Sequence, residues 1–202
     1  SNPQLSDSFG IEFKVRPLKE LATIMTYEAE LAEDESGRRT YRKTDRQKTV
    51  HVPYYIDYYS TRCVKFPYGY LITVNDPSVI ALLKMHGIQT ERITSKTLIE
   101  VEQFEISELK PSTRLNQGHY TNSIRGDYRS KAIEFPAGTL IVRSGQPLSV
   151  LASYLLEPQS NDGLMTWNFF DKYLVPQWGA GFYPYPVYRI VKPQVIATRS
   201  AY

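Results

Sequence analysis

The sequence QPLSVLASYLLEPQSNDGLMTWNFFDKYL, from Gln146 to Leu174, decides how the second half of the chain folds. A helix is predicted to begin at Pro147, because an apolar stripe follows at helical spacing: Leu148, Leu151, Ala152, Leu155 and Leu156. The helix ends at Pro158, since a proline pushes the residue before it, Glu157, out of helical geometry. Asn161-Asp162-Gly163 then predicts a turn. The stretch therefore predicts a helix that buries one face, followed by a chain reversal.

Strands and one more helix are predicted between residues 68 and 143. Tyr70 to Val74 is a buried-strand run, and Asp76-Pro77 opens a helix that Gly87 ends. Three further segments are strand candidates: Ile88 to Ile93, Leu98 to Ile106 and Thr139 to Arg143. The polar stretch from Ser107 to Ser130 is predicted to be loop, with at most one irregular hairpin.

The N-terminal third reads as antiparallel β-structure. Leu21 to Leu31 alternates with period two, residues 34–37 are turn formers, and Arg38 to Lys48 is strongly basic. An acidic strand facing a basic one predicts a hairpin with cross-strand ion pairs. The alternative is a basic site for phosphate or carboxylate groups.

A tyrosine-rich strand follows from Val50 to Tyr59, with Pro53 suggesting an edge or an irregular start. Its tyrosines, Tyr54, Tyr55, Tyr58 and Tyr59, are expected to pack in a core or an interface. The alternative is a stacking platform for a ligand such as a sugar.

The fold class expected from these patterns is α+β with β predominating. Antiparallel strands in residues 1–66 are joined to a mixed sheet with two short flanking helices in residues 67–202, packed as one domain. The tail from Tyr183 to Ile190 is expected to lie extended along a surface.

Composition excludes several function classes. The formal net charge of +3 on 202 residues is too small to argue for nucleic-acid binding. No apolar run of about 18 residues exists, so no membrane span is expected. No signal peptide is recognisable at the start, which leaves export of a longer precursor to the periplasm or the exterior open. The lone Cys63 allows no intrachain disulfide and is expected to be a small buried side chain.

Seven short motifs occur between residues 67 and 191: PYGYLI (67–72), HGI (86–88), VEQF (101–104), QGH (117–119), FPAG (135–138), LLEP (155–158) and WNFFD (167–171). In this order they resemble the C-terminal, noncatalytic region of bacterial zinc carboxypeptidases of the carboxypeptidase A type. The resemblance implies a parent protein that is a metallopeptidase, a hydrolase acting in proteolysis, with zinc in an upstream catalytic domain. That upstream peptidase domain is the implied partner.

The zinc site itself has no counterpart here. These enzymes hold zinc through a His-x-x-Glu pair and a distant histidine. The three histidines, His51, His86 and His119, are followed three places later by Tyr54, Gln89 and Asn122. We therefore expect no catalytic residue, no cofactor and no metal ligand in this chain.

The motif residues are instead predicted to be structural or interfacial: His119, Glu157, Asp162, Gly163, Trp167, Asn168, Phe169 and Asp171. Two functions remain open. The chain is expected to be an accessory domain of a zinc carboxypeptidase, which removes C-terminal amino acids. The alternative is a carbohydrate- or peptide-binding module that uses tyrosine and tryptophan surfaces, including Trp167 and Trp178. An enzyme in its own right has the least support.

Overall fold

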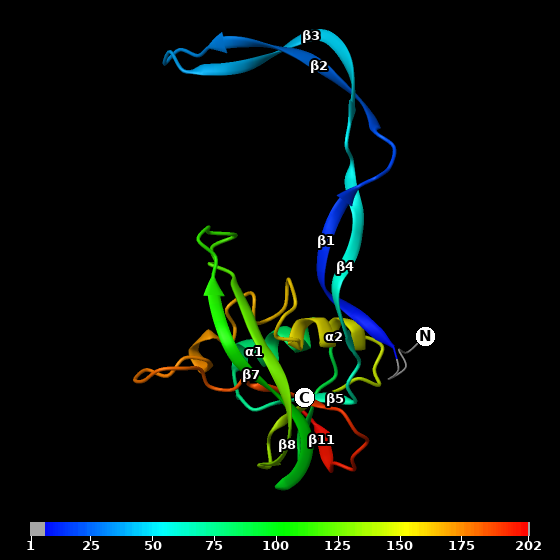
Figure 1. Cartoon of the computed structure of the whole chain (residues 1–202), viewed down its shortest axis with the longest axis vertical. Helices are drawn as coiled ribbons and strands as arrows, with labels where there is room; N and C mark the ends of the chain where they lie inside the picture. The colour runs from blue at the N-terminus through cyan, green and yellow to red at the C-terminus, as the bar shows by residue number, and fades with distance from the viewer. Residues whose placement is uncertain (1–6, 202) are drawn as a thin grey trace. The chain divides into compact units, whose positions relative to one another are not determined.

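The computed structural model describes residues 7–201 and confirms an α+β fold in which β-structure predominates (Figure 1). The chain divides into two compact units. One unit consists of residues 1–12 and 60–202, and the other of residues 13–59. No helix within residues 7–201 has the length and apolar character needed to cross a membrane.

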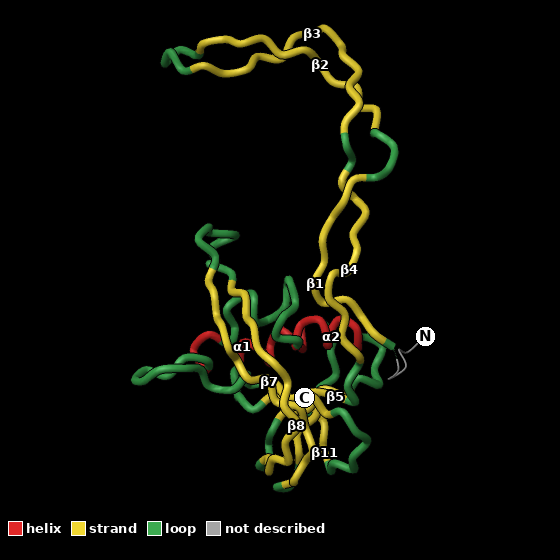
Figure 2. Tube along the Cα trace, in the orientation of Figure 1, coloured by secondary structure: helices red, strands yellow, loops and turns green. Residues whose placement is uncertain are grey.

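The larger unit is built on a seven-stranded sheet in the order β11-β6-β9-β5-β10-β7-β8. Figure 2 draws the strands of the chain in yellow and the helices in red. Its strands are β5 (Gly69–Ile72), β6 (Glu91–Ile93), β7 (Thr97–Pro111), β8 (Asn122–Phe135), β9 (Leu140–Arg143), β10 (Val187–Ile190) and β11 (Thr198–Ser200). All the neighbouring strands pair antiparallel, whereas a mixed sheet was predicted. The difference arises because strand β10, from the tail, lies between β5 and β7.

Two helices and a short 3-10 turn complete this unit: α1 (Pro77–Met85), α2 (Ser149–Leu156) and η1 (Asp171–Tyr173). Val79 and Leu83 of α1 join Leu155 and Leu156 of α2 in a core with the sheet residues Tyr70, Ile72, Phe104, Leu140 and Val142. A second core on the other face contains Leu71, Ile93, Ile99, Val101 and Ile141. The alternation of Tyr70, Leu71 and Ile72 between the two cores follows the two-residue period of a strand buried on both faces.

Helix α1 begins and ends where the sequence predicts. The Asp76 carboxylate accepts the backbone N–H of Ser78 at 2.9 Å, and Pro77 occupies the first turn. Gly87 follows the helix with φ 75°, a conformation that costs a side-chain-bearing residue energy. Lys172 and Tyr173 also reach Asp76 Oδ2, at 2.8 and 3.0 Å, and tie η1 to this helix start.

The predicted surface tail is instead a central strand. Val187 to Ile190 pairs with β5 along its whole length and with β7 at Tyr188 and Arg189. Tyr185, Val187 and Ile190 are buried. The proline spacing in this segment indicated extended structure but did not distinguish an edge from the centre of a sheet.

The predicted loop from Ser107 to Ser130 is also wrong in its main part. Strands β7 and β8 form a long hairpin in register from Thr97↔Phe135 to Pro111↔Asn122, with one irregularity at Ile106/Glu108. Gly126 lies within β8 and not in a turn, and a Cβ there would lie 2.1 Å from the backbone oxygen of Glu105. Polar composition misled the prediction, since these strands expose most of their side chains.

The smaller unit contains the predicted antiparallel hairpin of β2 (Ala22–Glu33) and β3 (Arg39–Val52). Arg46 pairs with Glu28 at 2.6 Å and with Glu30, which confirms cross-strand ion pairs. No residue from 13 to 59 is buried. The tyrosines Tyr54, Tyr55, Tyr58 and Tyr59 are exposed and make no core, in contrast to the core packing expected as one option. Strands β1 (Ser8–Pro17) and β4 (Tyr55–Lys65) form a separate two-stranded sheet.

Candidate functional site

The motif residues gather at the turn that follows α2. Trp167 donates its indole N–H to the Asp162 carboxylate, five residues before it. His119, in the loop between β7 and β8, packs edge-on against Trp167 with ring centroids 5.3 Å apart. Motifs that are 43 or more residues apart in sequence therefore meet in one cluster.

Asp171 lies at the centre of this cluster. The side-chain amide of Asn122 donates to both carboxylate oxygens at 2.8 Å, and that of Asn168 donates to one of them at 2.9 Å. Asn168 also donates to the carbonyl of Tyr120, so its own oxygen faces His119 Nδ1 at 3.1 Å. An amide oxygen can only accept, so this contact is one in which the imidazole would donate.

The backbone conformation of Asn168 explains why asparagine stands at the second position of WNFFD. Asn168 has φ 69°, a left-handed conformation that asparagine tolerates better than most residues. The hydrogen bonds to Asp171 and Tyr120 hold the residue in that conformation. Trp167 and Phe169, the residues on each side of Asn168 in sequence, both line one recess.

Glu157 occupies a second, deeper cluster under the sheet. Its side chain is 1% exposed and forms an ion pair with both guanidinium nitrogens Nε and Nη2 of Arg189, Nε at 2.8 Å. Tyr70 and Tyr128 donate their hydroxyls to the same carboxylate at 2.8 and 3.2 Å. Burial, followed by the nearby charge of Glu157, raises the pKa of both phenols well above the usual value. The cluster joins the end of α2 to the central strand β10.

An apolar recess of about 300 Å³ lies beside the motif cluster. Residues of α1, α2 and the following turn line it: Leu82, His86, Leu151, Tyr154, Leu155, Asp162, Gly163, Leu164, Trp167 and Phe169. Gly163 leaves little room for a side chain there, since a Cβ would lie 3.0 Å from the backbone oxygen of Tyr154. Trp167, Phe169 and Leu151 are only partly buried, so the recess presents apolar surface to its surroundings.

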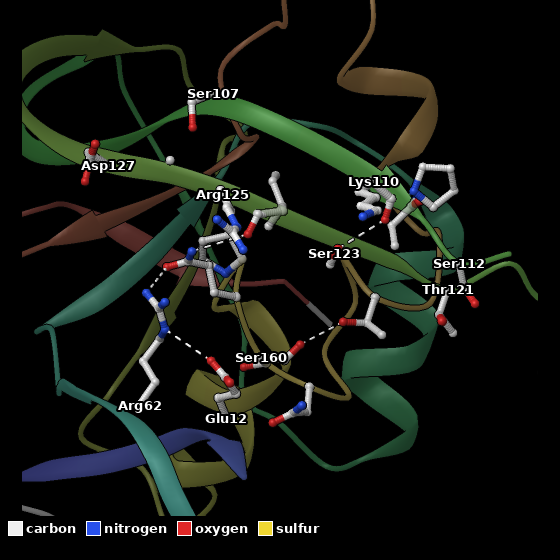
Figure 3. Close-up of a pocket in the computed structure, with 18 of the residues that line it drawn as sticks. Glu12, Arg62, Ser107, Lys110, Ser112, Thr121, Ser123, Arg125, Asp127 and Ser160 are labelled. Carbon is white, nitrogen blue, oxygen red and sulfur yellow. Dashed lines mark hydrogen bonds and ion pairs between the residues drawn. The ribbon is translucent and has the colours of Figure 1, made fainter. Parts of the chain in front are cut away.

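A larger polar groove of about 1260 Å³ lies between the β7–β8 hairpin and residues 158–166 (Figure 3). Hydroxyl, amide and charged side chains line it, including Glu12, Arg62, Lys110, Ser123, Arg125, Asp127, Gln159 and Ser160. Arg62 donates to Gln159 Oε1 at 2.8 Å and pairs with Glu12 at 3.4 Å. Asn122 and Thr166 both line the groove. The Asn122 side-chain amide donates to Asp171 of the motif cluster, and the Asn122 backbone N–H donates to the Thr166 carbonyl.

The arrangement offers no set of metal ligands. Within residues 7–201, no three His, Cys, Asp or Glu side chains come together as they would around a metal ion. His86 is the C-cap of α1, His51 contacts Thr23 on the exposed hairpin, and His119 belongs to the motif cluster. A zinc centre of the carboxypeptidase type does not fit these residues. Cys63 is exposed, which corrects the expectation of a buried thiol.

Sequence reasoning named the motif cluster but missed the groove. Lys110, Ser123, Arg125 and Asp127 fall in the segment predicted to be loop, and Ser160 directly precedes the predicted turn Asn161-Asp162-Gly163. The alternation of Ile124 with polar neighbours was the available signal for a half-buried strand.

Comparison with curated proteins gives a distant similarity. The chain is 22% identical over 124 residues to carboxypeptidase 2 of Trichophyton tonsurans, covering 61% of this chain and 22% of that protein. It is 23% identical over 112 residues to carboxypeptidase 2 of Trichophyton rubrum, covering 53% and 21%. The chain thus spans about a fifth of the length of these relatives. No family model matches the chain, and no solved structure matches it at the stringency that these relatives meet. A carboxypeptidase-related region is therefore present.

Proposed function

We propose that this chain is a noncatalytic accessory domain of a longer zinc carboxypeptidase of the carboxypeptidase A type, following its catalytic domain. In this proposal residues 1–66 and 67–202 act together as one accessory domain. The parent is a bacterial hydrolase that removes C-terminal amino acids from peptides, and its zinc belongs to the upstream domain.

The observation that carries the proposal is the internal use of the motif polar groups. The side chains of Asp162, Asn168 and Asp171 bond one another or their immediate neighbours. Glu157 is closed off by Arg189 and two tyrosines. A general acid or base needs an open approach to substrate, which Glu157 lacks at 1% exposure. Asp162 is exposed, but its carboxylate already accepts the Trp167 indole N–H. The distant similarity to fungal carboxypeptidases supports the peptidase parent.

The apolar recess is the surface by which the domain would pack on the peptidase domain. Trp167 and Phe169 are large aromatic side chains left partly exposed around a concave, mostly apolar surface. Such anchors commonly carry the binding energy of an interface. Packing there would also explain why the specific WNFFD sequence surrounds a site without catalytic chemistry.

The test replaces Trp167 by alanine in the full-length protein that contains the peptidase domain. We expect a lower melting temperature, with turnover of a C-terminal amino acid retained per folded molecule. Leu98→Ala is the matched control, because Leu98 is exposed and does not line the recess. Unchanged stability with abolished turnover would mean that the motif reaches into an active site, and would overturn the accessory role.

A binding module remains the second candidate, for one specific reason. Strand β4 presents Tyr55 and Tyr58 at 58% and 71% exposure, with Tyr54 and Tyr59 nearby. Exposed rings of this kind can stack on sugars. Loss of chitin or peptidoglycan retention in a Tyr55→Ala, Tyr58→Ala double variant would support this function, and equal behaviour of the two proteins would remove it.

A further inference from the structure

Strand β8 ends the seven-stranded sheet, so one side of its backbone has no partner strand among residues 7–201. Alternate residues of such a strand direct N–H and C=O groups outward. Asn122 marks the outward set, because its N–H donates to the Thr166 carbonyl at 3.0 Å, outside the sheet. Ile124 belongs to the same set, since its carbonyl accepts from Gln159 Nε2 at 3.3 Å.

Gly126 is the next outward residue by this alternation, and it lines the polar groove. The register irregularity of the hairpin lies on β7, between Ile106 and Glu108, and so does not disturb the alternation along β8. Within the groove, Gly126 is therefore the outward-facing residue of β8 whose backbone is not already bonded by Thr166 or Gln159. A hydrogen-bonding ligand with backbone spacing would match it.

Ser160 adds a second, independent observation. Its residue is 3% exposed, it lines the groove, and its hydroxyl has no hydrogen-bond partner among the described residues. A buried hydroxyl without a partner costs free energy. The hydroxyl oxygen is itself enclosed by protein, so a ligand carbonyl or amide in the groove would reach it once the Ser160 side chain rotates toward the groove.

The charges in the groove differ in how far they are already neutralised. Arg62 is held by Glu12 and Gln159, and Arg125 makes only an exposed pair with Glu108 at 3.3 Å. The Lys110 ammonium contacts no carboxylate within residues 7–201. Lys110 lies opposite Ser123 in the hairpin (Figure 3). Along β8, Arg125 comes two residues after Ser123, and Asp127 comes four residues after it. One end of the groove thus favours a negative group, and the Asp127 end does not.

We propose that this groove binds an extended peptide segment as an added strand on β8, with one acidic side chain beside Lys110 and Arg125. A sugar is disfavoured because no aromatic side chain lines the groove, and sugar sites use aromatic faces. Main-chain hydrogen bonds would supply affinity and the two cations the side-chain preference. The proposal does not depend on a peptidase partner.

In the test, this chain is immobilised on beads and incubated with three pools of nonapeptides. The peptides are acetylated at the N-terminus and amidated at the C-terminus, and mixed residues surround one fixed central residue. The centre is glutamate, glutamine or lysine, and retained peptides are quantified by mass spectrometry. We expect the glutamate pool to be retained about tenfold more than the lysine pool, with glutamine between them, as about 1.4 kcal/mol of charge preference would give. Equal retention of all three pools, or retention of none, would overturn the proposal.

Backbone pairing is tested with N-methyl groups on alternate residues of the glutamate pool, in two registers. Only one set of alternate amides faces the partner strand, so one register should abolish retention and the other should preserve it. Equal loss in both registers, or in neither, contradicts strand addition.

Variants locate the site. Lys110→Glu should reverse the preference for glutamate over lysine, and Ser160→Ala should weaken retention while keeping that preference. Arg199→Glu is the control, because Arg199 is an exposed cation on β11, the opposite edge strand of the same sheet. Circular dichroism confirms that each variant is folded. An effect of Arg199→Glu as large as that of Lys110→Glu would place the peptide elsewhere.

Discussion

Glu157 and Arg189 form the most consequential residue contact in the molecule, because both charges are removed from water. The side chains are 1% and 12% exposed, and each also contacts Tyr128. Breaking a buried pair by removing one charge leaves the other unpaired. This ion pair links the LLEP segment to the tail, as does the hydrogen bond from the Tyr185 hydroxyl to the Leu156 carbonyl at 3.2 Å.

Glu157→Gln should lower the free energy of unfolding by about 3 to 5 kcal/mol, since Arg189 then keeps only the partly exposed Glu102, at 3.7 Å. Urea unfolding measures the change. The control is Glu100→Gln, whose exposed pair with Lys192 should be worth about 0 to 1 kcal/mol. Equal effects of the two substitutions would show that the buried pair is not the stronger contact.

Asp76 makes stability depend on pH. Hydrogen bonds from Lys172 and then Ser78 lower the pKa of its carboxyl below the usual range. A lowered folded-state pKa stabilises the fold above the unfolded pKa of about 3.9, and that stabilisation is lost as the pH falls through the folded value.

Asp76→Asn keeps an N-capping side chain but removes the charge. We therefore expect the variant to be less stable than the parent at pH 7, with the difference shrinking below about pH 4. Denaturant midpoints between pH 3 and pH 7 measure this. A stability difference that stays constant across that range would assign the effect to capping rather than to charge.

At the scale of elements, local signals predicted the helices better than the sheet. Asp76-Pro77 and Gly87 mark α1 because capping needs only neighbouring residues. The hairpin of β2 and β3 was likewise predicted from its own alternation and turn. By contrast, the place of Val187–Ile190 between β5 and β7 depends on partners that lie 80 or more residues away in sequence. The edge groove was missed for the same reason, since no local pattern shows which strand ends a sheet.

The apolar stripe of α2 is only partly buried. Ala152, Leu155 and Leu156 lie in the core, whereas Leu148 is 38% exposed. Leu155→Ala should cost about 2 to 5 kcal/mol of stability. Val150→Ala, at an exposed position of the same helix, should change stability by at most about 0.5 kcal/mol. A Leu155→Ala melting curve that overlays the parent's would mean that the stripe does not face the core.

At the scale of the whole molecule, the two units differ in how they are stabilised. Residues 13–59 contain no buried side chain, while the seven-stranded sheet has a core on each face. A two-stranded ribbon without a core is marginally stable. We therefore expect amides of β2 and β3 to exchange with deuterium on the order of 100-fold faster than those of β5 and β10. Hydrogen exchange with mass spectrometry measures this, and uniform protection would show that the hairpin is stabilised by packing not seen here.

The proposed role is that this chain contributes surfaces, not catalysis, to a longer carboxypeptidase. The most direct measurement is elemental analysis of the purified chain after zinc loading and desalting, with release of the C-terminal residue from N-acylated dipeptides assayed on the same sample. We predict zinc far below one equivalent and no release above the buffer rate, because a zinc centre needs three or four assembled ligands. About one tightly held zinc per chain, together with amino-acid release that a chelator abolishes, would contradict the account.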